Sequence, residues 1–148
     1  MGNGSDELIS IITQAFLEPR DEAIYTEFGF LQFPQAISVA GAKGVVAEDI
    51  NFTANVDNII SKINERTKLI FLANANNPTG TFIPKEEVIR LHKSIPSNII
   101  LVYDAAYSEF IINSDYIDGS NLVDKHDNVI MLRTFSKLHG LASLRLGW

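Results

Sequence analysis

The chain has 148 residues, of which 46% are hydrophobic and 20% are charged, a composition that can build the core of one domain. Twelve basic and eighteen acidic residues leave a net charge of −6, which argues against nucleic acid or an anionic membrane surface as a partner. Cysteine is absent, so disulfides and thiolate metal sites are excluded. The apolar runs are far shorter than the ~20 residues of a membrane helix, and the first residues do not read as an export signal. We therefore expect a soluble, cytoplasmic protein.

The first third of the chain alternates between helical and strand patterns. Apolar residues at helical spacing predict a helix that starts at Ser5, read as its N-cap, and ends before Pro19. The next expected elements are a short strand, a helix and a second short strand, at residues 23–25, 30–39 and 43–47. Pro34 fits this second helix only near its first turn.

The rest of the chain continues the alternation with longer apolar runs. Isoleucines after a capping residue, Asn55 or Asp57, predict a third helix. A buried strand, a helix and two further buried strands are then expected at residues 67–75, 84–95, 98–103 and 128–133. This order predicts an α/β fold of three layers, αβα, with a mainly parallel sheet covered by helices on both faces. No linker or repeat divides residues 1–148, so we expect one domain.

Polar residues follow the carboxyl ends of the predicted strands. Asn77 comes after the strand that ends near residue 75, Asp104 follows the next strand, and Tyr107 lies three residues further on. The third strand is followed by a polar group of three residues, Thr134, Ser136 and Lys137. Ligands of open α/β sheets bind beyond the carboxyl ends of the strands, so one shared site is expected there.

These residue types suit an aldehyde cofactor that carries a phosphate. A lysine amine that loses its proton can form a Schiff base with an aldehyde, and Lys137 is the candidate. A phosphate would be held by hydroxyls, a guanidinium and the backbone amides of a helix start. The residues that offer these groups are Thr134, Ser136, Arg145, Ser5 and Asp6.

The remaining candidates fit a pyridine ring. A carboxylate such as Asp104 can keep a pyridine nitrogen protonated, which makes the ring an electron sink. Asn77 and Tyr107 can hydrogen-bond a phenolic oxygen, and Phe30 offers a face for stacking. Taken together, these groups predict a pyridoxal phosphate pocket.

Each candidate also has a purely structural interpretation. Lys137 can be a surface lysine, Asp104 a cap and Asn77 part of a turn, while Phe30 can belong to the core and Arg145 can lie along a strand edge. Their shared position beyond the strand ends favours the site. The histidines are too scattered in sequence to predict a metal site: His92, His126 and His139.

Four segments resemble, in order and spacing, the motifs of fold-type I pyridoxal phosphate aminotransferases. They are GNGSDELI (residues 2–9), NNPTG (76–80), DAAY (104–107) and TFSKLHGLASLRLGW (134–148). The GNGSDE opening is most similar to the histidinol-phosphate aminotransferase family. The resemblance runs over nearly all of the chain and implies the large domain of fold-type I pyridoxal phosphate-dependent transferases.

The resemblance also implies roles for single residues. Lys137 would be the Schiff-base lysine and proton shuttle, and Asp104 the partner of the pyridinium nitrogen. Asn77 and Tyr107 would take the positions at the ring oxygen, and Phe30 the stacking position. The phosphate positions would fall to Ser5, Asp6, Thr134, Ser136 and Arg145.

For the whole enzyme, the resemblance implies amino transfer between histidinol phosphate and 2-oxoglutarate in histidine biosynthesis, by a homodimer. It also implies that an N-terminal arm and a small C-terminal domain are absent from residues 1–148. Two alternatives within the same cofactor class are an aromatic amino-acid aminotransferase and a related lyase or decarboxylase. For the chain alone, a non-catalytic fragment that binds pyridoxal phosphate is a further alternative.

Three residues depart from the family pattern. Ala105 stands where a glutamate is frequent, His139 where an aromatic or apolar residue is common, and Phe33 where a tyrosine is common. Because Asp104 and Tyr107 are retained, cofactor binding is expected to persist. The changes at His139 and Phe33 predict a shift in substrate preference toward aromatic amino acids.

Overall fold

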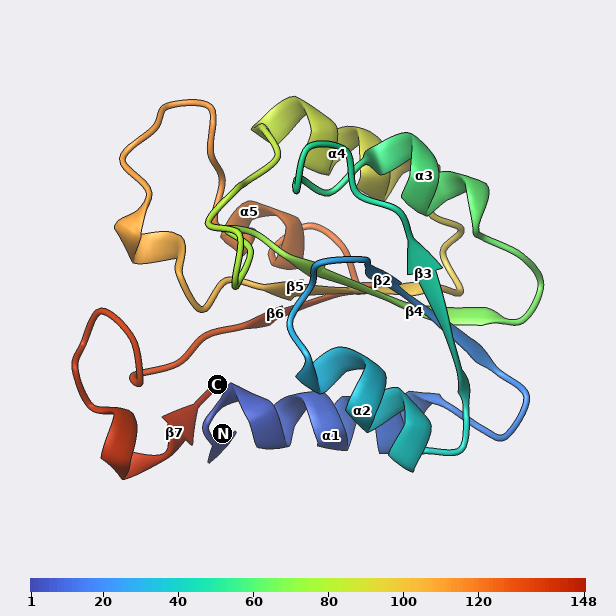
Figure 1. The fold of residues 1–148 in the computed structure, drawn as a ribbon, viewed down its shortest axis with the longest axis horizontal. Helices are drawn as coiled ribbons and strands as arrows, with labels where there is room; N and C mark the ends of the chain where they lie inside the picture. The colour runs from blue at the N-terminus through green and yellow to red at the C-terminus, as the bar shows by residue number, and fades with distance from the viewer.

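The computed structural model describes residues 1–148, and its centre is a five-stranded, fully parallel sheet (Figure 1). The strands are β2 (Glu22–Thr26), β3 (Lys43–Ala47), β4 (Thr67–Ala73), β5 (Ile100–Asp104) and β6 (Val129–Leu132). Their order across the sheet is β3-β2-β4-β5-β6. The chain therefore reverses its direction of travel across the sheet between β2 and β4, the kind of position at which α/β folds place ligands.

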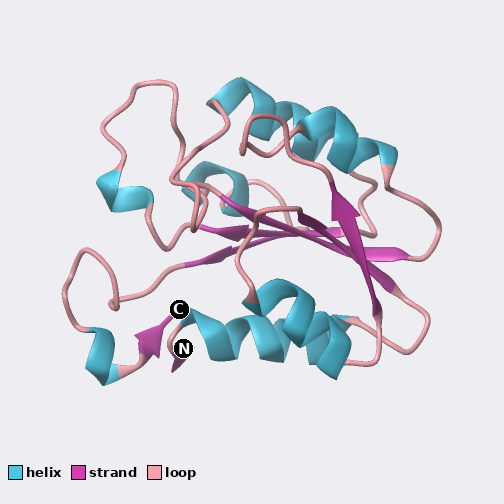
Figure 2. Ribbon diagram, in the orientation of Figure 1, coloured by secondary structure: helices cyan, strands magenta, loops and turns pink.

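Helices cover both faces of the sheet, as Figures 1 and 2 show. On one face lie α1 (Ser5–Phe16) and α2 (Gln32–Val39), and on the other lie α3 (Val56–Ser61), α4 (Lys85–Ser94) and α5 (Ser120–Val123). Two short 3₁₀ helices, η1 (Ser108–Phe110) and η2 (Ala142–Leu144), lie in the loops. The predicted three-layer αβα fold is confirmed. None of the helices has the length and apolar character needed to cross a bilayer.

The core has one apolar layer on each side of the sheet. Along β4, Leu69 and Phe71 pack toward α1 and α2, whereas Ile70 and Leu72 pack toward α3 and α4. All four side chains are fully buried. A strand buried on both faces needs apolar residues at every position, which is why this segment reads as a continuous hydrophobic run.

Several predicted boundaries need correction. Ser5 is not an N-cap: Gly4 takes that position with a φ of 81°, and Ser5 is the first helical residue. A glycine adopts this left-handed backbone without strain, and no side-chain hydrogen bond caps the helix there. Asn55 caps α3 by accepting a hydrogen bond from the Asn58 amide at 2.9 Å, which resolves the choice against Asp57. The strand expected to reach residue 75 ends at Ala73.

A two-stranded sheet that the sequence did not predict joins the two ends of the chain. In it, β1 (Gly2–Asn3) pairs antiparallel with β7 (Leu146–Gly147). Gly147 lies so close to the turn before α1 that a Cβ at this position would be 2.6 Å from the Gly4 carbonyl carbon. The small sheet therefore holds the last residues of the chain against the start of α1 (Figure 1).

At the opposite, amino end of the sheet, Glu22 is a buried carboxylate with several donors. Its oxygens accept hydrogen bonds from Asn64 at 2.7 Å, from Arg66 at 2.7 and 3.0 Å, and from Lys43 at 3.2 Å. The Asn64 amide is the largest cause of a lowered pKa, followed by Arg66 and Lys43, and together they outweigh burial and bring the pKa of Glu22 to about 2.

Glu22→Gln is expected to lower the free energy of unfolding by about 2–3 kcal/mol at pH 7. Because the pKa is lower in the folded chain, this stabilisation is present above about pH 4 and is lost as pH falls through about 2. The deficit of the variant should therefore shrink by about half at pH 3. Urea unfolding at both pH values measures it, with the exposed Glu86→Gln as a control that changes little. An equal deficit at both pH values would contradict this assignment.

Candidate active site

A cleft lies at the carboxyl ends of β4, β5 and β6 and encloses about 540 Å³, including its open mouth. Thirteen residues line it. Ten are the residues that the sequence singled out: Ser5, Asp6, Phe30, Asn77, Asp104, Tyr107, Thr134, Ser136, Lys137 and Arg145. The other three are small and were not predicted: Ala73, Ala75 and Ala106. Alanines at or just beyond a strand end leave space for a ligand, but the residue type alone does not distinguish them from core alanines.

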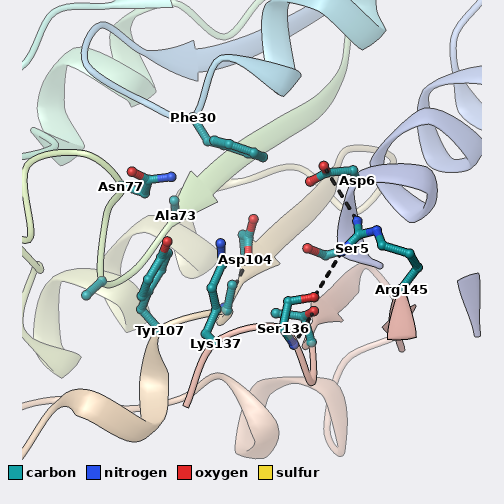
Figure 3. A pocket seen from close by; sticks show the side chains of 13 residues that line it. Ser5, Asp6, Phe30, Ala73, Asn77, Asp104, Tyr107, Ser136, Lys137 and Arg145 are labelled. Atoms are coloured by element: carbon teal, nitrogen blue, oxygen red, sulfur yellow. Dashed lines mark hydrogen bonds and ion pairs between the residues drawn. The ribbon is translucent and has the colours of Figure 1, made fainter. Parts of the chain in front are cut away.

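One end of the cleft is rich in hydrogen-bond donors. The Arg145 guanidinium donates to Ser136 Oγ at 3.1 Å, to the Ala142 carbonyl at 3.1 Å and to the Asn3 carbonyl at 3.3 Å. It also lies 4.0 Å from the Asp6 carboxylate (Figure 3). The first turn of α1, which begins at Ser5, points its free amides to the same place. An anion such as a phosphate suits this end.

The backbone around Gly4 brings Arg145 to the start of α1. Arg145 has a φ of 50°, and the pairing of β1 with β7 carries it next to residues 3 and 4. A Cβ on Gly4 would collide with the guanidinium of Arg145. The absence of a side chain at Gly4 is therefore needed both for its left-handed backbone and for the position of Arg145.

Gly4→Ala is expected to lower the free energy of unfolding by about 1–3 kcal/mol and to weaken binding of inorganic phosphate. The matched control is Gly140→Ala, which has a φ of 67° but no atom within 4 Å of the new Cβ. Both variants strain the backbone, but only Gly4→Ala displaces Arg145. Urea unfolding measures the backbone strain, and a phosphate titration measures the displacement of Arg145. An equal loss of phosphate binding in both variants would contradict the predicted clash between the new Cβ and Arg145.

The middle of the cleft contains a buried carboxylate. Asp104 ends β5, is only 5% exposed, and accepts one hydrogen bond, from the Ala106 amide at 3.0 Å. Burial raises its pKa to about 6, and the charge of Asp6 adds to this, whereas the Ala106 amide and the charge of Lys137 oppose it. A buried carboxylate with so little compensation is suited to a cationic hydrogen-bond donor in the ligand.

Lys137 and Tyr107 form the side of the cleft that faces Phe30 (Figure 3). The Lys137 Nζ lies 5.1 Å from the centre of the Tyr107 ring. Lys137 lies in a tight turn, in which its carbonyl accepts a hydrogen bond from the Gly140 amide at 2.9 Å. Asn77 lies beside Tyr107, and its side chain points into the same space. Phe30, Tyr107 and Lys137 therefore line one common space.

The three residues that depart from the family pattern do not line the cleft. Phe33 is fully buried and stacks on Phe71 with ring centres 4.8 Å apart, so it belongs to the core. Ala105 is fully buried, and His139 is held 3.8 Å from Glu109 outside the cleft.

The histidines are less scattered in space than in sequence. The rings of His92 and His126 pack against each other at a tilt of 39°, with centres 4.1 Å apart, and His92 Nε2 lies 3.0 Å from Asn128 Oδ1. Neither lines the cleft. No group of three or more histidine, cysteine, aspartate or glutamate side chains is arranged to hold a metal ion.

Comparison with known proteins places the chain in a family. The sequence profile described as aminotransferase class I and II matches residues 1–148. The histidinol-phosphate aminotransferases of Rhodopseudomonas palustris strain BisB18 and Rhodospirillum centenum are 50% and 47% identical to it, over 99% of the chain and 40% of each relative. The chain thus spans about two fifths of the length of these curated relatives.

The fold is shared with solved structures. The histidinol-phosphate aminotransferase of Sinorhizobium meliloti, crystallised in complex with pyridoxal-5'-phosphate, superposes with a TM-score of 0.91 at 29% identity, covering 99% of this chain and 40% of that one. A second crystal structure, from Erwinia carotovora, gives a TM-score of 0.92 at 25% identity, over 99% of this chain and 43% of that one. The sequence match over the full chain, supported by this fold, shows that the chain belongs to the class I and II aminotransferase family.

Proposed function

We propose that the chain is the cofactor-binding domain of a pyridoxal phosphate-dependent aminotransferase that transfers an amino group between histidinol phosphate and 2-oxoglutarate in histidine biosynthesis. The observation that carries this proposal is the convergence on one cleft of nine residues from four separate motifs, together with Phe30. The names of relatives that are about half identical to the chain support the choice of substrate.

The cleft fits pyridoxal phosphate in shape and in charge. The phosphate would lie at the donor-rich end, against Arg145, Ser136 and the first turn of α1, with Thr134 and Asp6 beside it. The ring would lie against Phe30, with its nitrogen toward Asp104. Burial raises the pKa of Asp104, so a cationic hydrogen-bond donor on the ring would stabilise its carboxylate. When bound, the cofactor supplies an aldehyde for a lysine amine and a ring that accepts electrons released at the substrate.

Four residues of the cleft would have separate roles in the reaction. Lys137 Nζ, which lines the cleft, would bind the aldehyde and, once released from it, would accept the proton from the Cα of the amino donor. Tyr107, whose ring centre lies 5.1 Å from that nitrogen, and Asn77 would donate hydrogen bonds to the ring oxygen and so orient the cofactor. Asp104 would keep a proton on the ring nitrogen.

The relatives are more than twice as long as the chain, so we infer that residues 1–148 are the large domain of a longer enzyme. The remaining length would supply an N-terminal arm and a small C-terminal domain that binds the substrate carboxylate. In this proposal the complete enzyme is a cytoplasmic homodimer that acts on small amino-acid and 2-oxo-acid substrates.

The proposal is tested by absorbance in two steps. The chain is first titrated with pyridoxal phosphate, and a saturable spectral change at one equivalent per chain is expected. The complete enzyme, loaded with cofactor, is then mixed in single turnover with histidinol phosphate or with phenylalanine. Faster conversion with histidinol phosphate supports the proposed substrate. Faster conversion with phenylalanine would overturn it, and the absence of a saturable change in the first step would overturn the cofactor assignment.

A further inference from the structure

Tyr107 and Lys137 reach the cleft from two different loops, and one carboxylate outside the cleft contacts both loops. Tyr107 immediately precedes η1, and Lys137 lies in the turn after β6. Glu109, in η1, does not line the cleft. Its carboxylate pairs with the guanidinium of Arg133, the residue that directly follows β6. The same Glu109 oxygen lies 3.8 Å from the imidazole of His139, two residues beyond Lys137.

We propose that Glu109, paired with Arg133, is a positioning residue that sets the relative placement of Tyr107 and Lys137. This inference rests on the proposed function, because the placement matters for a ligand that both side chains contact.

The surroundings of the pair favour this role over that of a surface salt bridge. The side chains of Glu109 and Arg133 are 18% and 19% exposed, whereas the other ion pairs each include a side chain that is at least 35% exposed. Arg133 also reaches Asp118 at 3.3 Å, so its planar fork is held by two carboxylates. Limited exposure and a second partner reduce the solvent screening that makes surface pairs weak.

The backbone connects the pair to the two functional side chains. The Phe110 amide donates to the Tyr107 carbonyl at 3.1 Å, so Tyr107 belongs to the hydrogen-bonded turn of η1. In the second loop, Arg133 forms two backbone hydrogen bonds with Trp148, at 2.7 and 3.0 Å. They hold the backbone at the start of the loop that contains Lys137. The contact between Glu109 and Arg133 thus joins two hydrogen-bonded segments, and each segment carries one side chain of the cleft.

Glu109→Gln tests the inference, because it preserves the size of the side chain and removes its charge. In the chain without cofactor, hydrogen exchange is expected to speed up about tenfold in residues 105–111 and 134–141 and to stay unchanged in β4. The Kd for pyridoxal phosphate is expected to rise about tenfold, because a displaced lysine and tyrosine contact the ring less well. Arg133→Lys, which retains the charge but loses the fork, should give a smaller change of both readouts.

The matched control is Glu87→Gln on α4. It removes the charge from an ion pair with Arg90, in which the N–O distance is 2.6 Å and neither residue lines the cleft. It should change neither the exchange of the two loops nor the affinity for pyridoxal phosphate. The inference would be overturned if Glu109→Gln left the exchange rate of the two loops unchanged, or raised the exchange rate of β4 by the same factor. It would also be overturned if the loops exchanged faster while the Kd for pyridoxal phosphate stayed the same. If the wild-type chain does not bind pyridoxal phosphate, the proposed function fails, whereas the exchange measurement still decides whether Glu109 joins the two loops.

Discussion

Lys137→Ala is expected to abolish covalent capture of pyridoxal phosphate while leaving the chain folded. Lys137 is the lysine that lines the cleft, and its side chain is exposed to solvent, so its removal creates no cavity in the core. Without this amine, the chain would lack both the nucleophile that bonds to the aldehyde and the base that accepts the Cα proton. In the complete enzyme, the rate of amino transfer should fall by roughly 10³-fold or more, since positioned acid–base groups alone contribute about 10²–10⁴.

The absorbance of the bound cofactor measures this loss, and Lys93→Ala is the matched control. Lys93 is an exposed lysine of α4 that does not line the cleft, so its removal should leave the spectrum and the affinity unchanged. A Lys137→Ala chain that still gives the wild-type spectrum would contradict the role of Lys137. An equal loss of the cofactor absorbance in both variants would show that the cofactor does not bind specifically in the cleft.

Asp104→Asn is expected to have opposite effects on stability and on cofactor binding. At pH 7 the wild-type chain carries a buried charge at Asp104, whose pKa burial raises to about 6. Replacing it by a neutral amide should raise the free energy of unfolding of the cofactor-free chain by about 2–3 kcal/mol. The affinity for pyridoxal phosphate should fall by roughly 10- to 100-fold, because a charged hydrogen bond to the ring nitrogen is lost.

The dependence on pH gives this prediction a definite sign. The pKa of Asp104 is higher in the folded chain, so the stability associated with its bound proton is fully present below about pH 4 and is lost as pH rises through about 6. The advantage of Asp104→Asn should therefore be small at pH 4, grow up to about pH 6 and stay constant above it. Urea unfolding across this range measures it, with the exposed Asp124→Asn as control. A variant that is less stable than wild type at pH 7 would contradict the argument.

The sheet was predictable from sequence because its central strands are buried on both faces. In β4 and β5, packing on both sides requires nearly continuous apolar residues, and that pattern is visible without a structure. The positions of Asn77, Asp104 and Lys137 followed from the rule that parallel strands present their carboxyl ends at one edge. The resemblance to known aminotransferases added the individual roles, which remain predictions.

The parts that were not predicted depend on contacts between distant residues. The pairing of β1 with β7 involves only two residues on each side, including two glycines, so no periodic pattern announces it. The space for a side chain at the N-cap Gly4 is taken by the guanidinium of Arg145, which lies at the other end of the chain. Glu109 gave no signal either, because its importance lies in the pairing with Arg133 and not in a motif.

The role proposed for Lys137 as the residue that joins the cofactor can be tested by chemical labelling. The chain is mixed with pyridoxal phosphate, the mixture is reduced with borohydride and the modified peptide is mapped. We expect one label per chain, located on Lys137 within the segment from Thr134 to Trp148. A label on any other lysine, or no label at all, would contradict it.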